Sequence, residues 1–290
     1  MQFQKPETTM KEFKPLDLFK EISDNELMTV HEDYLHQKTI LGIDIYRYSQ
    51  YPLTEQIYIP VLFETLYNAT TKNLMSHEKF FFSRYKKTAD FKKDFISTGD
   101  GGFQIFDNPV EALIFALVFQ MNVKRFVSGS NTVDFRKKLH KIISDIELRY
   151  AITFDTIYSY NSNFFGAGII NNARILSKDS LNRLLVDNNT INWFTNNLNS
   201  VENLVTIDKN SFVLTDSFKD YDTNLHSAIF DLGKSFKSVI ASKIGSISAK
   251  ETRLDIYNLY CQALFQLKID KHDYNDFVIT LGNINPSGIQ

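Results

Sequence analysis

The chain has 290 residues, 43% hydrophobic and 23% charged, the composition of an ordinary globular protein of one or two domains. It carries 32 basic and 34 acidic residues, and this net charge of −2 provides no basic field to hold nucleic acid. The single cysteine, Cys261, excludes an internal disulfide framework and indicates a reducing cytosol. The six histidines form no His-x-x-x-His pair, so a zinc-protease site is not expected.

The first 37 residues are polar and charged, and they contain no continuous apolar run of the kind found in signal peptides. We expect a tail that leads into a short helix around residues 16–28. The longest apolar run in the chain is Ala112–Phe119, eight residues, whereas a membrane-spanning helix needs about 20. The sequence therefore predicts a cytoplasmic protein without a membrane partner.

The first half of the chain alternates strand and helix signals. Residues 39–46 form a short Ile-rich run typical of a buried strand, and residues 52–73 have helical spacing that Pro60 should interrupt. Residues 79–85 and 90–97 are expected as strands. Thr98-Gly-Asp-Gly-Gly102 is a turn signal, which predicts a hairpin with Asp100 at its tip.

The second half begins with a helix whose start is well marked, because Asn108 is a good N-cap and Pro109 suits the first helical position. It should run to about Val127. Further elements are expected as one or two strands over 139–158 and helices over 169–176 and 180–193, followed by a mostly helical segment over 226–267. The order predicts an α+β fold with helices on a mostly antiparallel sheet.

Two acidic residues stand out by their context. Asp44 lies inside an apolar strand, and Asp100 lies between glycines at a hairpin tip. A buried carboxylate is costly unless it is paired or binds a metal ion. If the strand and the hairpin are neighbours, both carboxylates meet at one site, and two oxygen ligands without His or Cys suit Mg²⁺ or Mn²⁺. Taken singly, each acid is more simply explained as a cap or turn residue.

Three motifs resemble those of class III nucleotidyl cyclases, in the same order along the chain. Gly42-Ile-Asp-Ile-Tyr-Arg-Tyr-Ser49 is similar to their first strand, and Thr98-Gly-Asp-Gly101 is similar to their Gly-Asp-Gly hairpin. Gly166-Ala-Gly-Ile-Ile-Asn-Asn-Ala-Arg-Ile-Leu176 is similar to the helix that carries their Asn and Arg. The three motifs span residues 40–178.

The resemblance implies a ferredoxin-like βαββαβ cyclase homology domain over residues 38–195. It leaves a tail with a short helix over 1–37 and a mostly helical C-terminal extension over 196–290. It further implies a head-to-tail homodimer in which one subunit binds two Mn²⁺ or Mg²⁺ ions and the other supplies a transition-state arginine. The implied metal ligands are Asp44, Asp100 and the carbonyl of Ile45, and the implied arginine is Arg174. The backbone N–H groups that would cradle phosphates belong to Ile45, Tyr46, Arg47 and Tyr48.

The sequence departs from the resembled family at several positions. The ribose-orienting Asn would fall at Ile170, and Asn171 is one place later. The two positions that read a purine base carry Ile96 and Asn163, which match neither the adenine nor the guanine pattern. Arg47 stands where the family usually has Gly, and Tyr48 and Tyr51 add hydroxyl groups that could help to read a base.

Because it lacks both purine-reading patterns, the sequence resembles the pyrimidine cyclases of the bacterial Pycsar anti-phage system. This resemblance predicts an enzyme that converts UTP, or another nucleoside triphosphate, to a cyclic monophosphate that acts through a cyclic-nucleotide-binding effector. The alternatives are a cytidylate or adenylate cyclase, or a catalytically dead cyclase-like regulatory module. A diguanylate cyclase is not favoured, because Gly101-Gly102-Phe103 follows Asp100 where that family has further acids.

Overall fold

The central strand of the fold is β1 (Leu35–Ile45), which contains Asp44 near its end. It pairs antiparallel with β3 (Gly101–Phe106), whose other edge pairs with β2 (Phe95–Ser97). On its other side β1 neighbours β4 (Leu148–Tyr160). The order β2-β3-β1-β4 is that of a ferredoxin-like βαββαβ unit, so the predicted α+β fold is confirmed.

The computed structural model describes residues 35–129, 134–160, 163–180, 183–197, 212–215, 235–249, 252–268, 274–285 and 287–289. Residues 36–290 form one compact unit, and apart from Leu35, the first residue of β1, all described residues belong to it. The tail and helix predicted before residue 35 lie outside the described residues. The domain boundary predicted at residue 196 falls inside the helix α7 (Asn188–Asn197).

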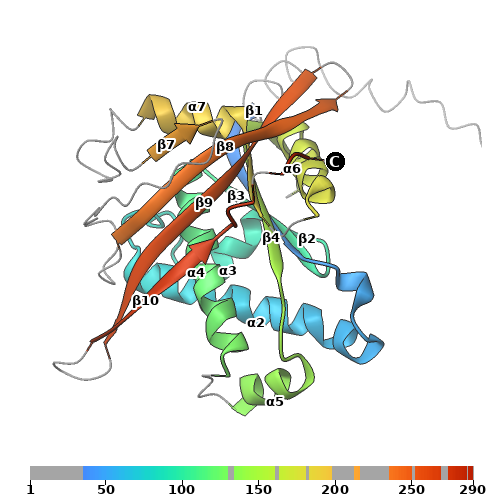
Figure 1. Cartoon of the computed structure of the whole chain (residues 1–290). Coiled ribbons are helices and arrows are strands. Elements are labelled where there is room, and N and C mark those ends of the chain that lie inside the picture. Colours follow the sequence, from blue (N-terminus) through green and yellow to red (C-terminus); the bar gives the residue numbers. More distant parts are fainter. Residues whose placement is uncertain are drawn as a thin grey trace, which may run out of the picture. The chain divides into compact units, whose positions relative to one another are not determined.

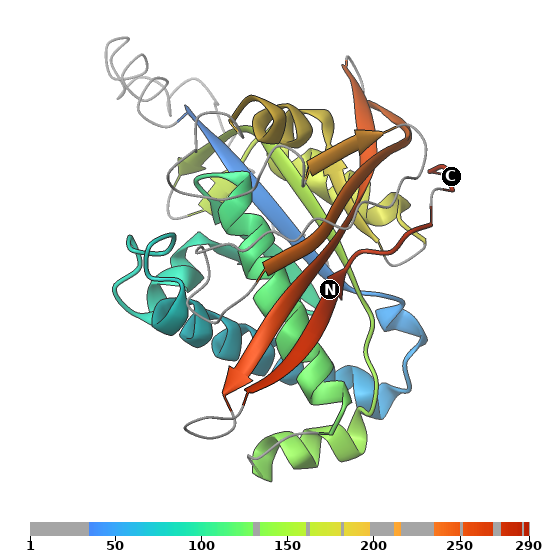
Figure 2. The same cartoon turned by 60° about the vertical axis from the view of Figure 1, so that its left-hand side comes forward.

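Beyond β4 the sheet continues into long, curved strands (Figures 1 and 2). β6 (Leu184–Asp187) lies parallel to β4 and antiparallel to β9 (Thr252–Lys268). β9 pairs antiparallel with both β8 (Ser235–Ala249) and β10 (Tyr274–Leu281), and β7 (Phe212–Thr215) lies parallel to β8. The short β5 (Asn163–Phe165) pairs with the end of β4.

Helices cover both faces of the sheet. α2 (Leu53–His77) and α4 (Pro109–Val127) pack on the face of β1 that presents Leu41, Ile43 and Ile45. α6 (Ala167–Lys178) packs against β4 on the opposite face, where its Ile169 contacts the cluster that contains Ile40. The remaining helices are short: η2 (Tyr48–Gln50), α3 (Thr88–Phe91), η3 (Lys92–Asp94), α5 (Asp134–Ile142) and α7 (Asn188–Asn197).

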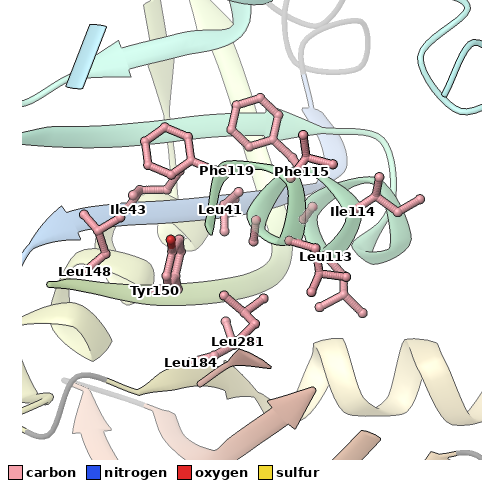
Figure 3. Close-up of a cluster of buried hydrophobic side chains, with 14 of the residues drawn as sticks. Leu41, Ile43, Leu113, Ile114, Phe115, Phe119, Leu148, Tyr150, Leu184 and Leu281 are labelled. Atoms are coloured by element: carbon pink, nitrogen blue, oxygen red, sulfur yellow. The ribbon is translucent and has the colours of Figure 1, made fainter. Parts of the chain in front are cut away.

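The main core lies between α4 and the sheet (Figure 3). The side chain of Asn108 accepts a hydrogen bond from the Glu111 N–H, and Pro109 occupies the first turn, as the sequence predicts. The apolar run of α4 is buried on nearly every side, and its Phe115 and Phe119 are fully buried. Burying a large apolar side chain contributes about 1.5–3 kcal/mol, so α4 anchors the fold.

The strand predicted over 79–85 is wrong. This segment consists of turns that lead into α3. Its Phe82 and Tyr85 are buried beside Phe91 of α3, and the ring centroids of Tyr85 and Phe91 lie 3.7 Å apart. Its run of three phenylalanines, Phe80–Phe82, has the aromatic composition that favours a strand. The helix predicted from residue 180 is also wrong in its first part, since residues 184–187 form the fully buried strand β6.

The mostly helical C-terminal extension is contradicted by the structure, because residues 235–249 and 252–268 form β8 and β9. The buried residues Ile240, Ile244 and Ile247 follow one another at spacings of four and three, which is typical of a helix. A register shift between Lys243 and Gly245 interrupts the regular alternation of the strand and creates that spacing.

Candidate active site

Asp44 is held on the α6 face of β1 by strand alternation. Its neighbours Ile43 and Ile45 point into the opposite core, so the carboxylate faces the other way. Gly42, on the same face as Asp44, makes room for α6, because a Cβ at this position would lie 2.0 Å from the Asn172 Oδ1. The Asp44 side chain keeps 20% exposure and opens onto a cleft.

The hairpin between β2 and β3 brings Asp100 to the end of β1. Asp44 is paired with Gly101 in the strand register, and the Ile45 N–H donates to the Asp100 carbonyl at 3.3 Å. A Cβ at Gly101 would lie 2.2 Å from the Ile43 carbonyl oxygen, so only glycine permits this close approach. The structure thus places together the two acids that the sequence singled out.

Both carboxylates line one cleft of about 190 Å³ between the hairpin and α6. Burial raises the pKa of Asp100, and the negative charge of Asp44 raises that pKa further. The positive charge of Arg149 lowers the pKa of Asp100. The cleft is therefore a place where negative charges repel one another and where a cation would be stabilised. The lining comprises Ile43, Asp44, Thr98, Asp100, Gly102, Phe103, Arg149, Ala173, Leu176 and Ser177.

Arg149 is a residue of the cleft that the sequence analysis missed. Its Nε donates to the Asp44 Oδ2 at 2.5 Å, and its Nη1 donates to the Asp179 carbonyl at 2.7 Å. It is the one cation in an otherwise apolar stretch at the start of β4, the same kind of contrast that marks Asp44 on β1. That contrast was the signal that could have identified it.

Two adjacent asparagines of α6 have different roles. Asn172 is fully buried, and its Nδ2 donates to the carbonyls of Ile40 and Ala151, which lie on neighbouring strands. Asn171, the predicted ribose-orienting residue, donates to an Asp155 carboxylate oxygen at 3.4 Å and accepts from the Arg174 Nη1 at 3.4 Å. Asn171 is thus tied to Arg174, and Asn172 fixes the helix to the sheet.

Arg174 lies on α6 but is not among the described residues that line the cleft, although Ala173 and Ser177 of the same helix are. Its side chain is half-buried and is held by Asn171. Within one copy of the chain, the predicted transition-state arginine and the two acids therefore do not share a cleft.

The segment after Asp44 matches the predicted phosphate cradle only in part. The N–H groups of Ile45 and Tyr46 already donate to the carbonyls of Asp100 and Glu147, so two of the four predicted amides have backbone partners. Arg47 has a φ of 57°, in the left-handed region that favours glycine. A glycine would adopt this conformation at lower cost than Arg47 does.

The predicted base-reading residues do not all meet. Ile96 is paired with Phe103 across the hairpin, and paired residues share a face, so Ile96 lies on the face of the cleft. Asn163 is exposed on β5, opposite Tyr160. Tyr48 donates its hydroxyl to the Gln56 carbonyl and packs on the main core.

Tyr51 lines a separate pocket of about 350 Å³ with Arg47 and Glu147. Neither Tyr48 nor Tyr51 is among the described residues that line the carboxylate cleft, and their role in reading the base stays a prediction. The Tyr51 carbonyl accepts a hydrogen bond from the Gln56 side chain of α2, and the side chains of Tyr48 and Tyr51 pack on the main core.

The donors in the cleft fit a hard divalent cation. The described residues contain no group of three or more His, Cys, Asp and Glu side chains that could hold a metal alone. Two carboxylates suffice for Mg²⁺ or Mn²⁺ when substrate phosphates and water complete the coordination. The presence of both carboxylates in the lining of one cleft is the observation that favours such an ion. In the part of the chain that the structure describes, no helix has the length and apolar character needed to cross a membrane.

No protein-family model matches the chain, and no curated protein matches it significantly. Among solved structures, it is similar to an adenylate/guanylate cyclase/hydrolase from Silicibacter pomeroyi, with 14% identity and a TM-score of 0.41, over 78% of this chain and 96% of that one. It is also similar to the adenylyl cyclase CyaB from P. aeruginosa, with 11% identity and a TM-score of 0.40, over 78% and 95% of the two chains.

A third similar structure is the dimeric guanylyl cyclase domain of the RhoGC fusion protein from Blastocladiella emersonii. Its identity is 9% and its TM-score 0.42, over 78% of this chain and 97% of that one. Similarities at this level do not establish an activity, so a function has to be argued from the residues of the cleft.

Proposed function

We propose that the chain is a nucleotidyl cyclase, which converts a nucleoside triphosphate to its 3′,5′-cyclic monophosphate and pyrophosphate. The observation that carries this proposal is the meeting of Asp44 and Asp100 in one cleft, beside Arg149. The acids come from two motifs that resemble those of class III cyclases, and the third motif forms the helix that closes the cleft.

The reaction requires the ribose 3′-hydroxyl to attack the α-phosphate in line while pyrophosphate leaves. Asp44 and Asp100 would hold two Mg²⁺ or Mn²⁺ ions, which activate the hydroxyl and neutralise the triphosphate. Arg149 offers a permanent positive charge with a forked geometry suited to phosphate oxygens. In the structure that guanidinium neutralises Asp44, and the incoming triphosphate would compete for it.

We place Arg174 in the site of a second copy of the chain. It does not line the cleft of its own copy, and Asn171 holds it on α6. A head-to-tail homodimer would bring this guanidinium to the developing phosphoryl charge of the facing copy. Each dimer would then contain two composite sites.

We propose a pyrimidine as the base, with UTP preferred. Ile96 offers no hydrogen bond to a base, and it is paired with Phe103, which lines the cleft. The Asn163 amide can match the edge of uracil or, in the flipped orientation, that of cytosine. The product, cyclic UMP, would serve as a second messenger in anti-phage defence by binding an effector.

The test is to incubate the purified chain with each of the four triphosphates and Mn²⁺, and to identify cyclic products by mass spectrometry. Asp44→Asn and Asp100→Asn should abolish product formation. Asp255→Asn is the matched control, because Asp255 is a half-buried acid on β9 that pairs with Lys243 away from the cleft.

Each outcome of this test has a defined meaning. Cyclisation of UTP ahead of CTP supports the full proposal. A preference for ATP would leave the cyclase activity standing and refute the pyrimidine assignment. Triphosphate binding without turnover, under all metal conditions, would identify a regulatory module and refute the enzyme.

A further inference from the structure

A buried ion pair lies directly behind Arg149. Arg183 and Asp179 each have only 1% of their side chain exposed, and the Arg183 Nε donates to the Asp179 Oδ1 at 3.0 Å. The Arg183 backbone N–H donates to the other carboxylate oxygen at 2.7 Å. Asp179 therefore cannot rotate without breaking two bonds.

The remaining donors of Arg183 reach the segment that follows β10. Its Nη1 donates to the Ser287 carbonyl at 2.6 Å and lies 3.5 Å from the Asn285 carbonyl. The buried Asn258 side chain of β9 donates to the carbonyls of Asn283 and Asn285. The C-terminal segment is thus fixed to β9 and presents its carbonyls to a buried cation.

This arrangement continues to the candidate active site through the backbone of Asp179. The same residue whose carboxylate holds Arg183 also accepts, through its carbonyl, the hydrogen bond from the Arg149 Nη1. Arg149 in turn donates to Asp44. Four successive contacts therefore connect Ser287 with the carboxylate that is proposed to bind the metal.

We propose that Arg183 is a positioning residue, which transmits the placement of the C-terminal segment to Arg149 and thereby orients Asp44. This inference rests on the proposed function for its effect on rate, but not for its effect on Arg149 itself. A buried ion pair is often no more stabilising than apolar residues of the same size, so its stability alone does not explain its presence. Orientation of a group next to a metal ligand does explain the presence of the pair, because substitution of such outer partners commonly lowers activity by 10–100-fold.

The main variant is Arg183→Lys, which keeps the charge beside Asp179 but loses the fork that also reaches the Ser287 carbonyl. We expect kcat to fall about tenfold, a typical size for a residue behind a metal ligand. The matched control is Arg253→Lys, because Arg253 is 74% exposed on β9 and pairs loosely with Asp255. It should leave kcat unchanged.

Two further readings separate positioning from a general loss of stability. If Arg183 acts through Arg149, then Arg183→Lys should have no additional effect on kcat in an Arg149→Met background. In addition, the Arg149 Nε–H, identified by NMR from its loss in Arg149→Met, should exchange with solvent at least tenfold faster in Arg183→Lys.

The second reading does not require activity. If the wild-type protein shows no cyclisation, but the Arg149 Nε–H exchanges faster in Arg183→Lys than in wild type, the inference is supported and the proposed function is refuted. Unchanged exchange and unchanged kcat in folded Arg183→Lys, or independent effects of the two substitutions, would overturn the inference. If Arg183→Lys does not fold, a chain ending at Asn285, which lacks the Ser287 carbonyl, is measured in the same way and decides the question.

Discussion

Gly101→Ala tests whether the close contact between the hairpin and β1 sets the geometry of the two carboxylates. The new Cβ would lie 2.2 Å from the Ile43 carbonyl oxygen and 3.0 Å from the Asp44 Cα. Both are backbone atoms, so neither can rotate away. Ordinary contact begins at 3.4 Å, and the hairpin would therefore have to withdraw from β1 by about 1.2 Å.

This displacement acts on Asp100 directly, because the Ile45 N–H bond to its carbonyl is already 3.3 Å long and would break. A misplacement of about 1 Å can reduce a rate by about 100-fold, and we expect a loss of that size in kcat. Overpacking of this kind also costs about 1–3 kcal/mol of folding free energy. The assay measures kcat at saturating triphosphate and Mn²⁺, together with the thermal midpoint.

The control is Gly129→Ala, after the end of α4. Gly129 has a φ of 70°, and its nearest neighbour for a new Cβ is a ring atom of His140 at 3.6 Å. This substitution should cost about 1–2 kcal/mol through backbone strain alone and leave kcat unchanged. If Gly101→Ala has the kcat of the control, or of wild type, the contact does not set the carboxylate geometry and the reasoning is wrong.

Three further outcomes follow from the site and the core. Removing divalent ions with EDTA should abolish cyclisation, as should Asp44→Ala or Asp100→Ala in folded protein; full activity in EDTA would refute the metal role. Mixing Asp44→Ala with Arg174→Ala protein should restore part of the activity, and no rescue in proven mixed dimers would count against composite sites. Burial raises the pKa of Glu111 from 4.5 to about 7. Between these two pH values the folded protein holds a proton that the unfolded chain has lost, so the free energy of unfolding should fall by about 3 kcal/mol as the pH rises through this range. Thermal melts at pH 5 and 8 should show that slope in wild type and not in Glu111→Gln.

The parts of the fold that the sequence predicted correctly are those with local signals. The start of α4 is marked by Asn108 and Pro109, which act within one turn of the helix. The hairpin that carries Asp100 is marked by its glycines. Both signals depend on backbone preferences of a few adjacent residues, so no knowledge of distant partners is needed.

The parts that were missed depend on contacts between distant segments. Arg149 became a site residue only through its bond to Asp44, 105 positions away. The spacing in β8 imitated a helix because a register shift interrupts its pairing with β9. Asn172 could not be separated from Asn171 by sequence alone, since its role depends on the carbonyls of two strands.

Asn172 limits how α6 can move relative to the sheet. The amide occupies the space that Gly42 leaves on β1 and is bonded to β1 and β4 at once. Sliding α6 by one turn, about 5.4 Å, would break these bonds inside the protein, where water cannot replace them. Arg174 and Asp44 of one copy thus belong to one rigid body. In the proposed head-to-tail dimer, closure around a triphosphate would then be a rotation of one whole subunit against the other.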